Sequence, residues 1–310
     1  MSSKTILVLD SLFKDLDVER ASATARSWEI RRWDGSPAEL GEADAVVHVR
    51  TQVDQTLIDR LTRCRVIGRF GVGLDSVDQQ AAASRGIAVV NVRDYCIPEM
   101  TAHTLALAFS LERRLNGWRN EKWIDADWQT FALERRVAGR TRAVVIGLGS
   151  IGTAVAGALR DLTYDVVAVT TRGRETAERM GLPIVPLDAG LLSADFLFLH
   201  AALEPATANL IDRRGLSMLP AGAILVNTAR LGLINQGAVA DALGSDRLSG
   251  LGIDARLEAD SPLRRFSDDP RVLITPHVGW YSERSARVLR ERTIMNTIDA
   301  YGAGAGRKAS

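Results

Sequence analysis

Three strand-like segments in the second half of the sequence are each followed by a side chain suited to proton or anion chemistry. Arg230 follows "GAILVNT", Asp254 and Glu258 follow "LSGLGI", and His277 follows "RVLIT". Hydride transfer to a carbonyl needs a cation to hold the substrate and an acid to protonate the new alkoxide, while a cofactor carries the redox chemistry. The guanidinium of Arg230 suits a carboxylate, and a carboxylate beside His277 would raise the pKa of the imidazole and keep it protonated.

Each of these residues also has an ordinary structural interpretation. Taken alone, Arg230 suits a salt bridge, Glu258 a solvated loop charge and His277 a surface turn. The carboxyl ends of parallel strands meet at one edge of a sheet, so their shared position favours the catalytic interpretation. We therefore expect the three side chains to converge on one crevice.

A glycine-rich turn lies earlier in the same half, within "RAVVIGLGSIGTAVAGALR". Gly147, Gly149 and Gly152 have the G-x-G-x-x-G spacing between an apolar strand and a helical segment. Glycine allows a tight turn and a close approach of the backbone to a pyrophosphate, which the helix N-terminus attracts. This context predicts a dinucleotide site.

The end of the next strand bears on the choice of dinucleotide. An NAD site usually has an acidic residue there, but this chain has Thr170 in "VAVTTRGRE", followed by Arg172 and Arg174. The arginines suit a 2′-phosphate and favour NADPH over NADH. The alternative is that both are solvated loop charges.

Strands alternating with helices must position these residues. With 310 residues, the chain is long enough for two domains. The first 92 residues contain "TILVLD", "ADAVVHV", "CRVIGRF" and "IAVVNV", and about six further apolar runs follow residue 141. This rhythm predicts an α/β fold of doubly wound parallel sheets. Between the two series come a helix, "PEMTAHTLALAFSLERRL", and an arm with Trp118, Trp123 and Trp128, which is a linker, a dimer contact or ordinary core. The last helix is expected to fray at "GAGAGRKAS".

The composition narrows the class of partner. Lysine and arginine number 39 against 38 aspartates and glutamates, so no net field attracts nucleic acid or an anionic membrane. Cys64 and Cys96 are too few for a disulfide framework and lack metal-site spacing, so we expect a reduced, cytoplasmic setting and no metal. No apolar run is long enough to span a membrane. A small molecule is the expected partner.

Five motifs together resemble the D-isomer-specific 2-hydroxyacid dehydrogenases. They are "GRFGVGLDSVD", "GLGSIG", "LHAALEPATANLI", "GAILVNTARLGLIN" and "ITPHVGWYSE". "DYC" and "HVGWYSE" are most similar to the branch of the C-terminal-binding-protein corepressors, whereas "TTRG" is similar to NADPH-using glyoxylate/hydroxypyruvate reductases. The resemblance implies two Rossmann-like domains, with a cofactor domain over 98–283 inserted into a substrate domain over 1–97 and 284–310, and a homodimer.

The resemblance also implies roles for individual residues. Arg230 would hold the substrate carboxylate, His277 would be the acid/base paired with Glu258, and Asp254 would contact the nicotinamide carboxamide. Substrate would also contact Arg69, Trp280 and the backbone amides around Val72 and Gly73. The other cofactor contacts would come from Ser150, Ile151, Thr170, Thr171, Arg172, His200, Thr207 and Thr228.

The chain departs from the family pattern at several positions. Ala259 stands where the catalytic glutamate is usual, between Glu258 and Asp260, so either acid is a candidate partner for His277 and we favour Glu258. Leu231 replaces a glycine, and Ala102 replaces an acid before His103, which we expect to pack in its helix. The expected activity is reduction of a 2-keto acid to a D-2-hydroxy acid, or the reverse. The alternative is a dinucleotide-sensing binding protein with little turnover.

Overall fold

Two parallel β-sheets organise the chain, one in each of two units. The computed structural model describes residues 3–118 and 138–306. Unit 1 comprises the residues up to 95 together with those from 282 onwards, and unit 2 comprises 96–281. The chain thus leaves unit 1 once and returns to it with its last helix.

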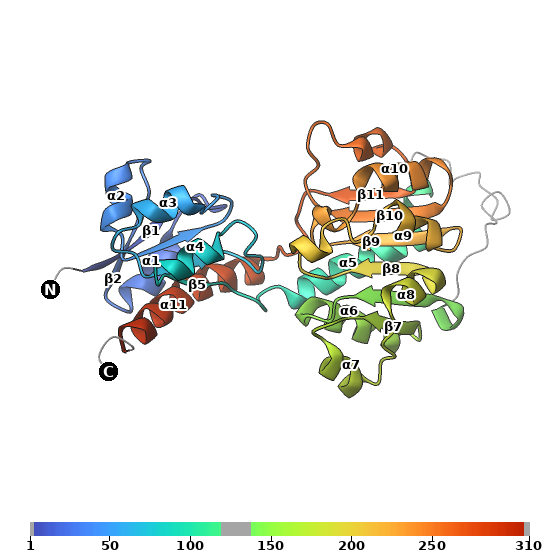
Figure 1. Cartoon of the computed structure of the whole chain (residues 1–310), viewed down its shortest axis with the longest axis horizontal. Coiled ribbons are helices and arrows are strands. Elements are labelled where there is room, and N and C mark those ends of the chain that lie inside the picture. Colours follow the sequence, from blue (N-terminus) through green and yellow to red (C-terminus); the bar gives the residue numbers. More distant parts are fainter. Residues whose placement is uncertain (1–2, 119–137, 307–310) are drawn as a thin grey trace. The chain divides into compact units, whose positions relative to one another are not determined.

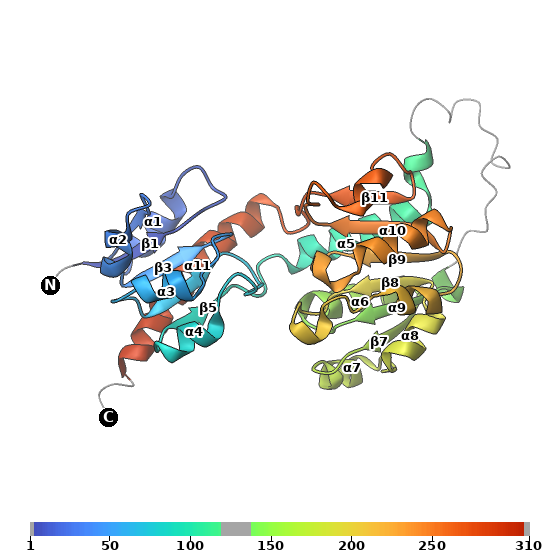
Figure 2. The same cartoon turned by 45° about the horizontal axis from the view of Figure 1, so that its top comes forward.

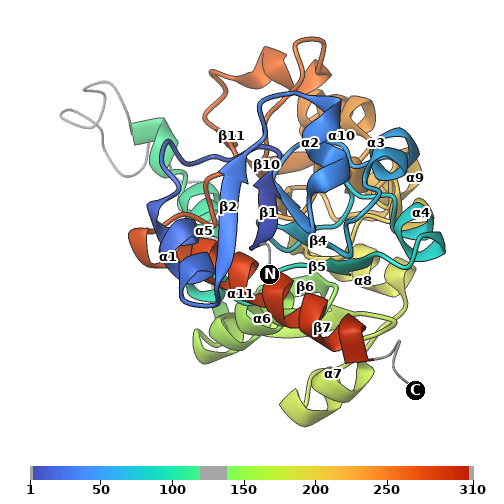
Figure 3. The ribbon, with the colours of Figure 1, turned by 90° about the vertical axis from the view of Figure 1, so that its left-hand side faces the viewer.

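Unit 1 is built on a five-stranded sheet with the order β2-β1-β3-β4-β5, and every pairing is parallel. Its strands are β1 (Lys4–Val8), β2 (Trp28–Arg32), β3 (Ala45–His48), β4 (Val66–Arg69) and β5 (Ala88–Val90). Its helices are α1 (Asp17–Thr24), α2 (Pro37–Glu42), α3 (Gln55–Arg60), α4 (Gln79–Ser84) and α11 (Glu283–Gly306). Helices α1 and α11 pack together on one side of this sheet, as Figure 3 shows.

Burial explains which strands of unit 1 are apolar throughout. The central strand β3 is buried at every position, because helices cover both of its faces. The edge strand β2 buries only Trp28 and Ile30 and exposes the residues between and after them. Helix α11 is fixed to α1 by Arg290, whose guanidinium donates two hydrogen bonds of 2.6 and 2.8 Å to the buried Glu19 carboxylate.

Unit 2 is built on a six-stranded parallel sheet with the order β11-β10-β9-β8-β6-β7 (Figure 1). Its strands are β6 (Arg142–Ile146), β7 (Asp165–Val169), β8 (Phe196–Leu199), β9 (Ala223–Asn227), β10 (Leu248–Asp254) and β11 (Val272–Thr275). Its α-helices are α5 (Ile97–Glu112), α6 (Ser150–Asp161), α7 (Arg174–Met180), α8 (Leu187–Ser193), α9 (Arg213–Met218) and α10 (Gln236–Gly244). Short 3-10 helices are η1 (Leu115–Trp118), η3 (Ala138–Arg140), η4 (Pro205–Thr207), η5 (Leu231–Leu233) and η6 (Pro262–Phe266).

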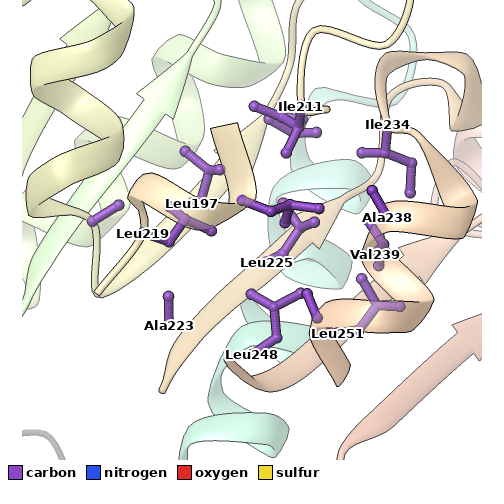
Figure 4. Packing of buried hydrophobic residues seen from close by; sticks show 14 of the residues in the cluster. Leu197, Ile211, Leu219, Ala223, Leu225, Ile234, Ala238, Val239, Leu248 and Leu251 are labelled. Atoms are coloured by element: carbon purple, nitrogen blue, oxygen red, sulfur yellow. The ribbon is translucent and has the colours of Figure 1, made fainter. Parts of the chain in front are cut away.

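The sheet of unit 2 has an apolar cluster on each face. Helices α5 and α6 cover one face (Figure 2). In the apolar cluster on that face, Phe196 and Phe198 stack with ring centroids 5.6 Å apart. On the other face, Leu225 of β9 lies among side chains from β8, β10 and α10, including Leu197 and Val239 (Figure 4). Two covered faces explain why these strands read as continuous apolar runs.

The doubly wound α/β fold expected from the sequence is confirmed, and all six apolar runs of the second half are strands. Two details differ from the expectation. Strand β2 was absent from the apolar runs, and α11 continues through Gly302 to Gly306, where fraying was expected. Trp123 and Trp128 lie outside the described residues. In the described part of the chain, no helix combines the length and the apolar character needed to cross a lipid bilayer.

Candidate active site

The strands that precede Arg230, Asp254 and His277 are neighbours in the sheet of unit 2. Strand β10 lies between β9 and β11, and its last residue, Asp254, pairs with Thr275 at the end of β11. Asn227 at the end of β9 pairs with Ile253. The three strand ends therefore form one row along the carboxyl edge of the sheet.

The Asp254 carboxylate is buried and holds the loop that carries His277. Its Oδ1 accepts hydrogen bonds from the Thr275 hydroxyl at 2.7 Å and from the backbone N–H of Val278 at 2.8 Å. Its Oδ2 accepts from the backbone N–H of Gly279 at 2.8 Å. The side chain is only 1% exposed, so these bonds to an ionised acceptor are shielded from water. Asp254 thus fixes the backbone on the C-terminal side of His277.

His103 of α5 joins this network through Thr275. Its Nε2 lies 2.9 Å from the Thr275 hydroxyl oxygen and 3.8 Å from Asp254 Oδ1. The single hydroxyl proton of Thr275 goes to the carboxylate, so the hydroxyl oxygen accepts from His103 and Nε2 carries a proton. His103 therefore packs in its helix, as expected, and also ties α5 to the carboxyl ends of β10 and β11.

His277 is exposed and has a left-handed backbone, with φ of 62°. Few residues other than glycine adopt this conformation, and they concentrate at functional positions. The Nδ1 atom lies 3.3 Å from the backbone carbonyl oxygen of Asp254, which can only accept a hydrogen bond, so this nitrogen carries a proton. Proton exchange with a ligand would then use Nε2.

Arg230 lies in a loop that Asn227 shapes. The buried Asn227 side chain donates to the Arg230 carbonyl oxygen at 2.9 Å and accepts from the Ala229 backbone N–H at 3.1 Å. Arg230 itself is half-buried, and its Nη1 donates to the Ala229 carbonyl oxygen at 3.0 Å. These contacts hold the guanidinium close to the end of β9.

Glu258 and Asp260 are the two acids that the sequence offers as partners for His277. Glu258 and Asp260 are both exposed, and neither carboxylate has a hydrogen bond or ion pair within that part of the chain. The loop turns at this point, since the Ser261 N–H donates to the Glu258 carbonyl oxygen at 3.1 Å and Ser261 caps η6. This turn leaves both acids in solvent, which the sequence pattern alone did not reveal.

The glycine-rich turn follows β6, at the point where the strand order reverses between β6 and β8. Gly147 has φ of 93°, and a Cβ there would lie 2.6 Å from the Ala201 backbone nitrogen, so the position excludes other residues. A Cβ on Gly152 would lie 2.0 Å from the Gly147 carbonyl oxygen, which shows how closely α6 packs on the turn. A Cβ on Gly149 would meet nothing within 4 Å.

This turn fits the pyrophosphate of a dinucleotide. The open space at Gly149 lies directly before the first turn of the 12-residue helix α6, whose free N–H groups favour an anion. Ser150 at the helix start is exposed and Ile151 is half-buried. The backbone therefore offers both the room and the donors that a phosphate needs.

His200, after β8, borders the same turn. Its Nε2 is buried and has no hydrogen-bond partner among the described residues, and its Cβ would be 3.1 Å from a Cβ on Gly152. Burial lowers the pKa of His200 to about 4, so the ring is neutral at neutral pH. A neutral, unpartnered nitrogen beside the glycine turn is consistent with a ligand contact there.

The loop after β7 contains the residues expected to recognise the adenosine ribose. The Thr170 hydroxyl accepts from the Gly173 N–H at 2.9 Å, which makes a tight turn. Arg172 is exposed and forms a bidentate ion pair with Glu204, with N–O distances of 2.6 and 2.9 Å. This pair raises the pKa of the Arg172 guanidinium. Arg174 is exposed and forms no ion pair within the described residues.

The other threonines expected to contact a cofactor differ in their exposure and in their hydrogen bonds. Thr171 is exposed, whereas the Thr207 hydroxyl donates to the Ala202 carbonyl oxygen at 2.7 Å and so shapes its own loop. Thr228 is buried, and its hydroxyl is 2.8 Å from that of Thr104 on α5. Thr207 and Thr228 therefore have structural contacts in addition to any contact with a ligand.

Unit 1 carries the predicted substrate residues after β4. Arg69 is half-buried, and its Nη1 donates to the Phe70 carbonyl oxygen. Its guanidinium lies over Gly71, which has φ of 135° and whose Cβ would collide with it. This left-handed turn leaves Val72 exposed and Gly73 half-buried, so their backbone lies at the surface of unit 1.

Trp280, the residue expected to line the pocket, is half-buried and packs edge-on against Tyr281, with ring centroids 5.6 Å apart.

The described residues contain no group of three or more histidine, cysteine, aspartate or glutamate side chains that could hold a metal ion.

Sequence reasoning missed three residues that shape the site, namely Asn227, Thr275 and Glu204. All three lie within motifs that were recognised, and the position of Asn227 and Thr275 at strand ends was an available signal. Glu204 is not at a strand end, and its partner Arg172 is 32 residues away in the chain.

Comparisons with known proteins agree with this arrangement. The model of the "D-isomer specific 2-hydroxyacid dehydrogenase, NAD binding domain" matches residues 101–279, more than half of the chain. A D-3-phosphoglycerate dehydrogenase of Mycobacterium bovis is 32% identical over 293 residues, which are 90% of this chain and 53% of that protein. The chain thus spans about half the length of these curated relatives.

Two further matches cover nearly the whole of both chains. A glycerate dehydrogenase of Methylorubrum extorquens is 28% identical over 312 residues, which are 93% of this chain and 95% of that protein. The crystal structure of a D-lactate dehydrogenase from Aquifex aeolicus shares the fold, with a TM-score of 0.88, 22% identity and coverage of 98% and 97%. The chain therefore belongs to the D-isomer-specific 2-hydroxyacid dehydrogenase family, and its second unit is the family's NAD binding domain.

Proposed function

We propose that this protein reduces a small 2-keto acid to the D-2-hydroxy acid, or catalyses the reverse reaction, with a nicotinamide dinucleotide. The observation that carries the proposal is the row of strand ends formed by β9, β10 and β11, with Arg230 and His277 on either side of the buried Asp254. A cation for a carboxylate and an imidazole for a proton are the two groups that this reaction needs.

Each residue then has a defined task. Arg230 binds the substrate carboxylate, and His277 donates a proton from Nε2 to the carbonyl oxygen as it is reduced. The Asp254 carbonyl oxygen orients His277 through Nδ1 at 3.3 Å. A bound dinucleotide supplies the hydride. Glu258 is exposed, and its carboxylate has no hydrogen bond or ion pair within the described residues, so the orienting contact used in this proposal is the Asp254 carbonyl oxygen.

The remaining predicted contacts complete the proposal. Asp254 still has a lone pair on Oδ2 for the nicotinamide carboxamide, because within the described residues that oxygen accepts a single hydrogen bond, from Gly279. In unit 1, the backbone around Val72 and Gly73, with Arg69, binds the substrate carboxylate. Trp280 contacts the substrate tail.

For the cofactor we propose NADPH in preference to NADH. Thr170 places no charge at the end of β7, and the exposed Arg174 is available to a 2′-phosphate. The names of the relatives support a small 2-hydroxy acid as substrate, since one is a glycerate dehydrogenase and the crystallised D-lactate dehydrogenase is described with NAD and lactic acid.

The test is a panel of 2-keto acids, assayed with NADPH and with NADH. We expect oxidation of NADPH with glyoxylate, hydroxypyruvate or a bulkier 2-keto acid, and a D-configured product by chiral chromatography. Absence of turnover across the whole panel with both nucleotides, in protein that binds the nucleotide, would refute the proposal.

A second candidate is a dinucleotide-sensing binding protein, and the unpartnered carboxylate of Glu258 is the observation that favours it. Such a sensor would oligomerise on binding nucleotide and show negligible reduction. Light scattering with and without NADPH, run beside the keto-acid panel, separates the two candidates.

Two further expectations belong to the same proposal. We propose a homodimer, which light scattering of the protein without nucleotide would measure. A cytoplasmic setting is supported by Cys64 and Cys96, which are both buried thiols outside any disulfide.

A further inference from the structure

The ion pair between Arg172 and Glu204 joins two different loops. Arg172 lies after β7 and Glu204 lies after β8, and β6 lies between these two strands in the sheet. The ion pair therefore joins the loops on either side of the glycine-rich turn. Its 2.6 and 2.9 Å contacts use both nitrogens of the guanidinium fork and both carboxylate oxygens.

The backbone of Glu204 is held in place as well. Glu204 is the N-cap of η4, where the Thr207 N–H donates to the Glu204 carbonyl oxygen at 2.9 Å and the Thr207 hydroxyl accepts from the Glu204 N–H at 2.8 Å. These bonds fix the backbone from which the side chain reaches Arg172, and the two-pronged ion pair holds the carboxylate itself.

The loop that carries Arg172 is equally well defined. A Cβ on Gly173 would lie 2.6 Å from the Leu148 Cβ, so this loop packs directly on the glycine-rich turn. A dinucleotide bound at that turn would place its adenosine ribose near the end of the following strand, which is β7. Arg172 is 78% exposed on its side chain and Glu204 is 39% exposed, so a phosphate can reach both.

We propose that Glu204 is a specificity-determining residue, which lowers the affinity for NADPH relative to NADH by competing with the 2′-phosphate for Arg172. The inference rests on the proposed dinucleotide site. A 2′-phosphate carries about two negative charges and must either displace the carboxylate or bind next to it. The ribose hydroxyl of NADH is uncharged, so it neither competes for Arg172 nor is repelled by the Glu204 carboxylate. Arg174 remains the uncontested cation, so NADPH binding is weakened and not abolished.

The test uses Glu204→Gln, because glutamine has nearly the same shape as glutamate but carries no charge. The probes are 2′,5′-ADP and 5′-ADP, titrated by calorimetry, and NADPH and NADH, titrated by nucleotide fluorescence. We expect 2′,5′-ADP and NADPH to bind about two- to five-fold more tightly to the variant, the upper part of the range set by an exposed ion pair. Binding of 5′-ADP and NADH should change less than two-fold.

The matched control is Asp165→Asn. Asp165 at the start of β7 pairs with Arg142 at the start of β6, at N–O distances of 2.6 and 2.7 Å, and is similarly exposed. This substitution removes the same charge from the opposite edge of the same sheet, and we expect it to leave both nucleotide affinities unchanged. In Arg172→Ala, the further change Glu204→Gln should give a smaller gain, because there is no arginine left to release.

The outcomes are distinct. A preference for 2′,5′-ADP that is unchanged or lower in Glu204→Gln overturns the role of Glu204, while leaving the dinucleotide site intact. An equal gain in Asp165→Asn also overturns it, because net charge alone would then explain the effect. If no probe binds the unsubstituted protein, the dinucleotide site and this inference both fail.

Discussion

Replacing Asp254 with asparagine tests whether this carboxylate holds the His277 loop. Asparagine has the same shape, but one of its two terminal atoms is an NH₂ donor. That donor would face the N–H of either Val278 or Gly279, each of which donates to Asp254 at 2.8 Å. One buried N–H then loses its acceptor, and the other contacts lose their charge.

The expected cost follows from these contacts. An unsatisfied buried N–H costs about 1–3 kcal/mol, and the change from charged to neutral hydrogen bonds adds about 1 kcal/mol. We therefore expect Asp254→Asn to lower the free energy of unfolding by about 2–4 kcal/mol, measured by urea denaturation. A shift of the His277 loop by about 1 Å would lower kcat by about 10²-fold.

The kinetic constants distinguish two roles for Asp254. If it mainly positions the loop, kcat falls more than the KM for nucleotide rises; if it mainly contacts the carboxamide, the KM for nucleotide takes most of the effect. The control is Asp212→Ala, which removes the N-cap of α9 and its 2.8 Å bond from the Gly215 N–H. That variant should lose about 1 kcal/mol and keep its kinetics. Stability of Asp254→Asn within about 0.5 kcal/mol of the unsubstituted protein would refute this reasoning.

Three further predictions concern single positions. Gly147→Ala should lower the free energy of unfolding by about 2 kcal/mol, measured by urea denaturation, and should weaken nucleotide binding at least ten-fold, measured by fluorescence titration. The reason is that the new Cβ would lie 2.6 Å from the Ala201 backbone nitrogen, on a backbone with φ of 93°. Arg230→Lys should lower kcat/KM for the keto acid about 10²-fold with an unchanged nucleotide Kd, because an ammonium cannot bind a carboxylate bidentately; equal kcat/KM would count against its role. Burial lowers the pKa of His48 from 6.5 to about 4, so its contribution to stability is complete above pH 6.5 and is lost as the pH falls to 4. This loss is on the order of 3 kcal/mol, and His48→Asn should remove it from the pH dependence of urea unfolding.

The strands of unit 2 were predictable because helices bury both faces of that sheet, which selects for continuous apolar runs such as those of β8 and β9. The edge strand β2 was not predictable from apolar runs, since it alternates the buried Trp28 and Ile30 with exposed residues. The end of α11 was also misjudged, because glycine weakens a helix and yet the turns up to Gly306 are helical.

The candidate site was predictable to the level of strand ends and no further. Arg230, Asp254 and His277 could be placed because consecutive parallel strands present their carboxyl ends together. The exposure of Glu258 and Asp260 and the pair of Arg172 with Glu204 depend on how the loops turn after the strands. Loop conformation is set by contacts such as the bond from Ser261 N–H to the Glu258 carbonyl, which no periodicity encodes.

The most direct measurement is the single-turnover rate of NADPH oxidation in His277→Asn, with the best 2-keto acid of the panel. Asparagine tolerates the left-handed backbone at φ of 62°, so the free energy of unfolding should stay within about 1 kcal/mol of the original. We expect the rate to fall by about 10²- to 10⁴-fold, the contribution of a positioned acid. A folded variant that reduces the keto acid at the original rate would contradict the assignment of His277 as the proton donor.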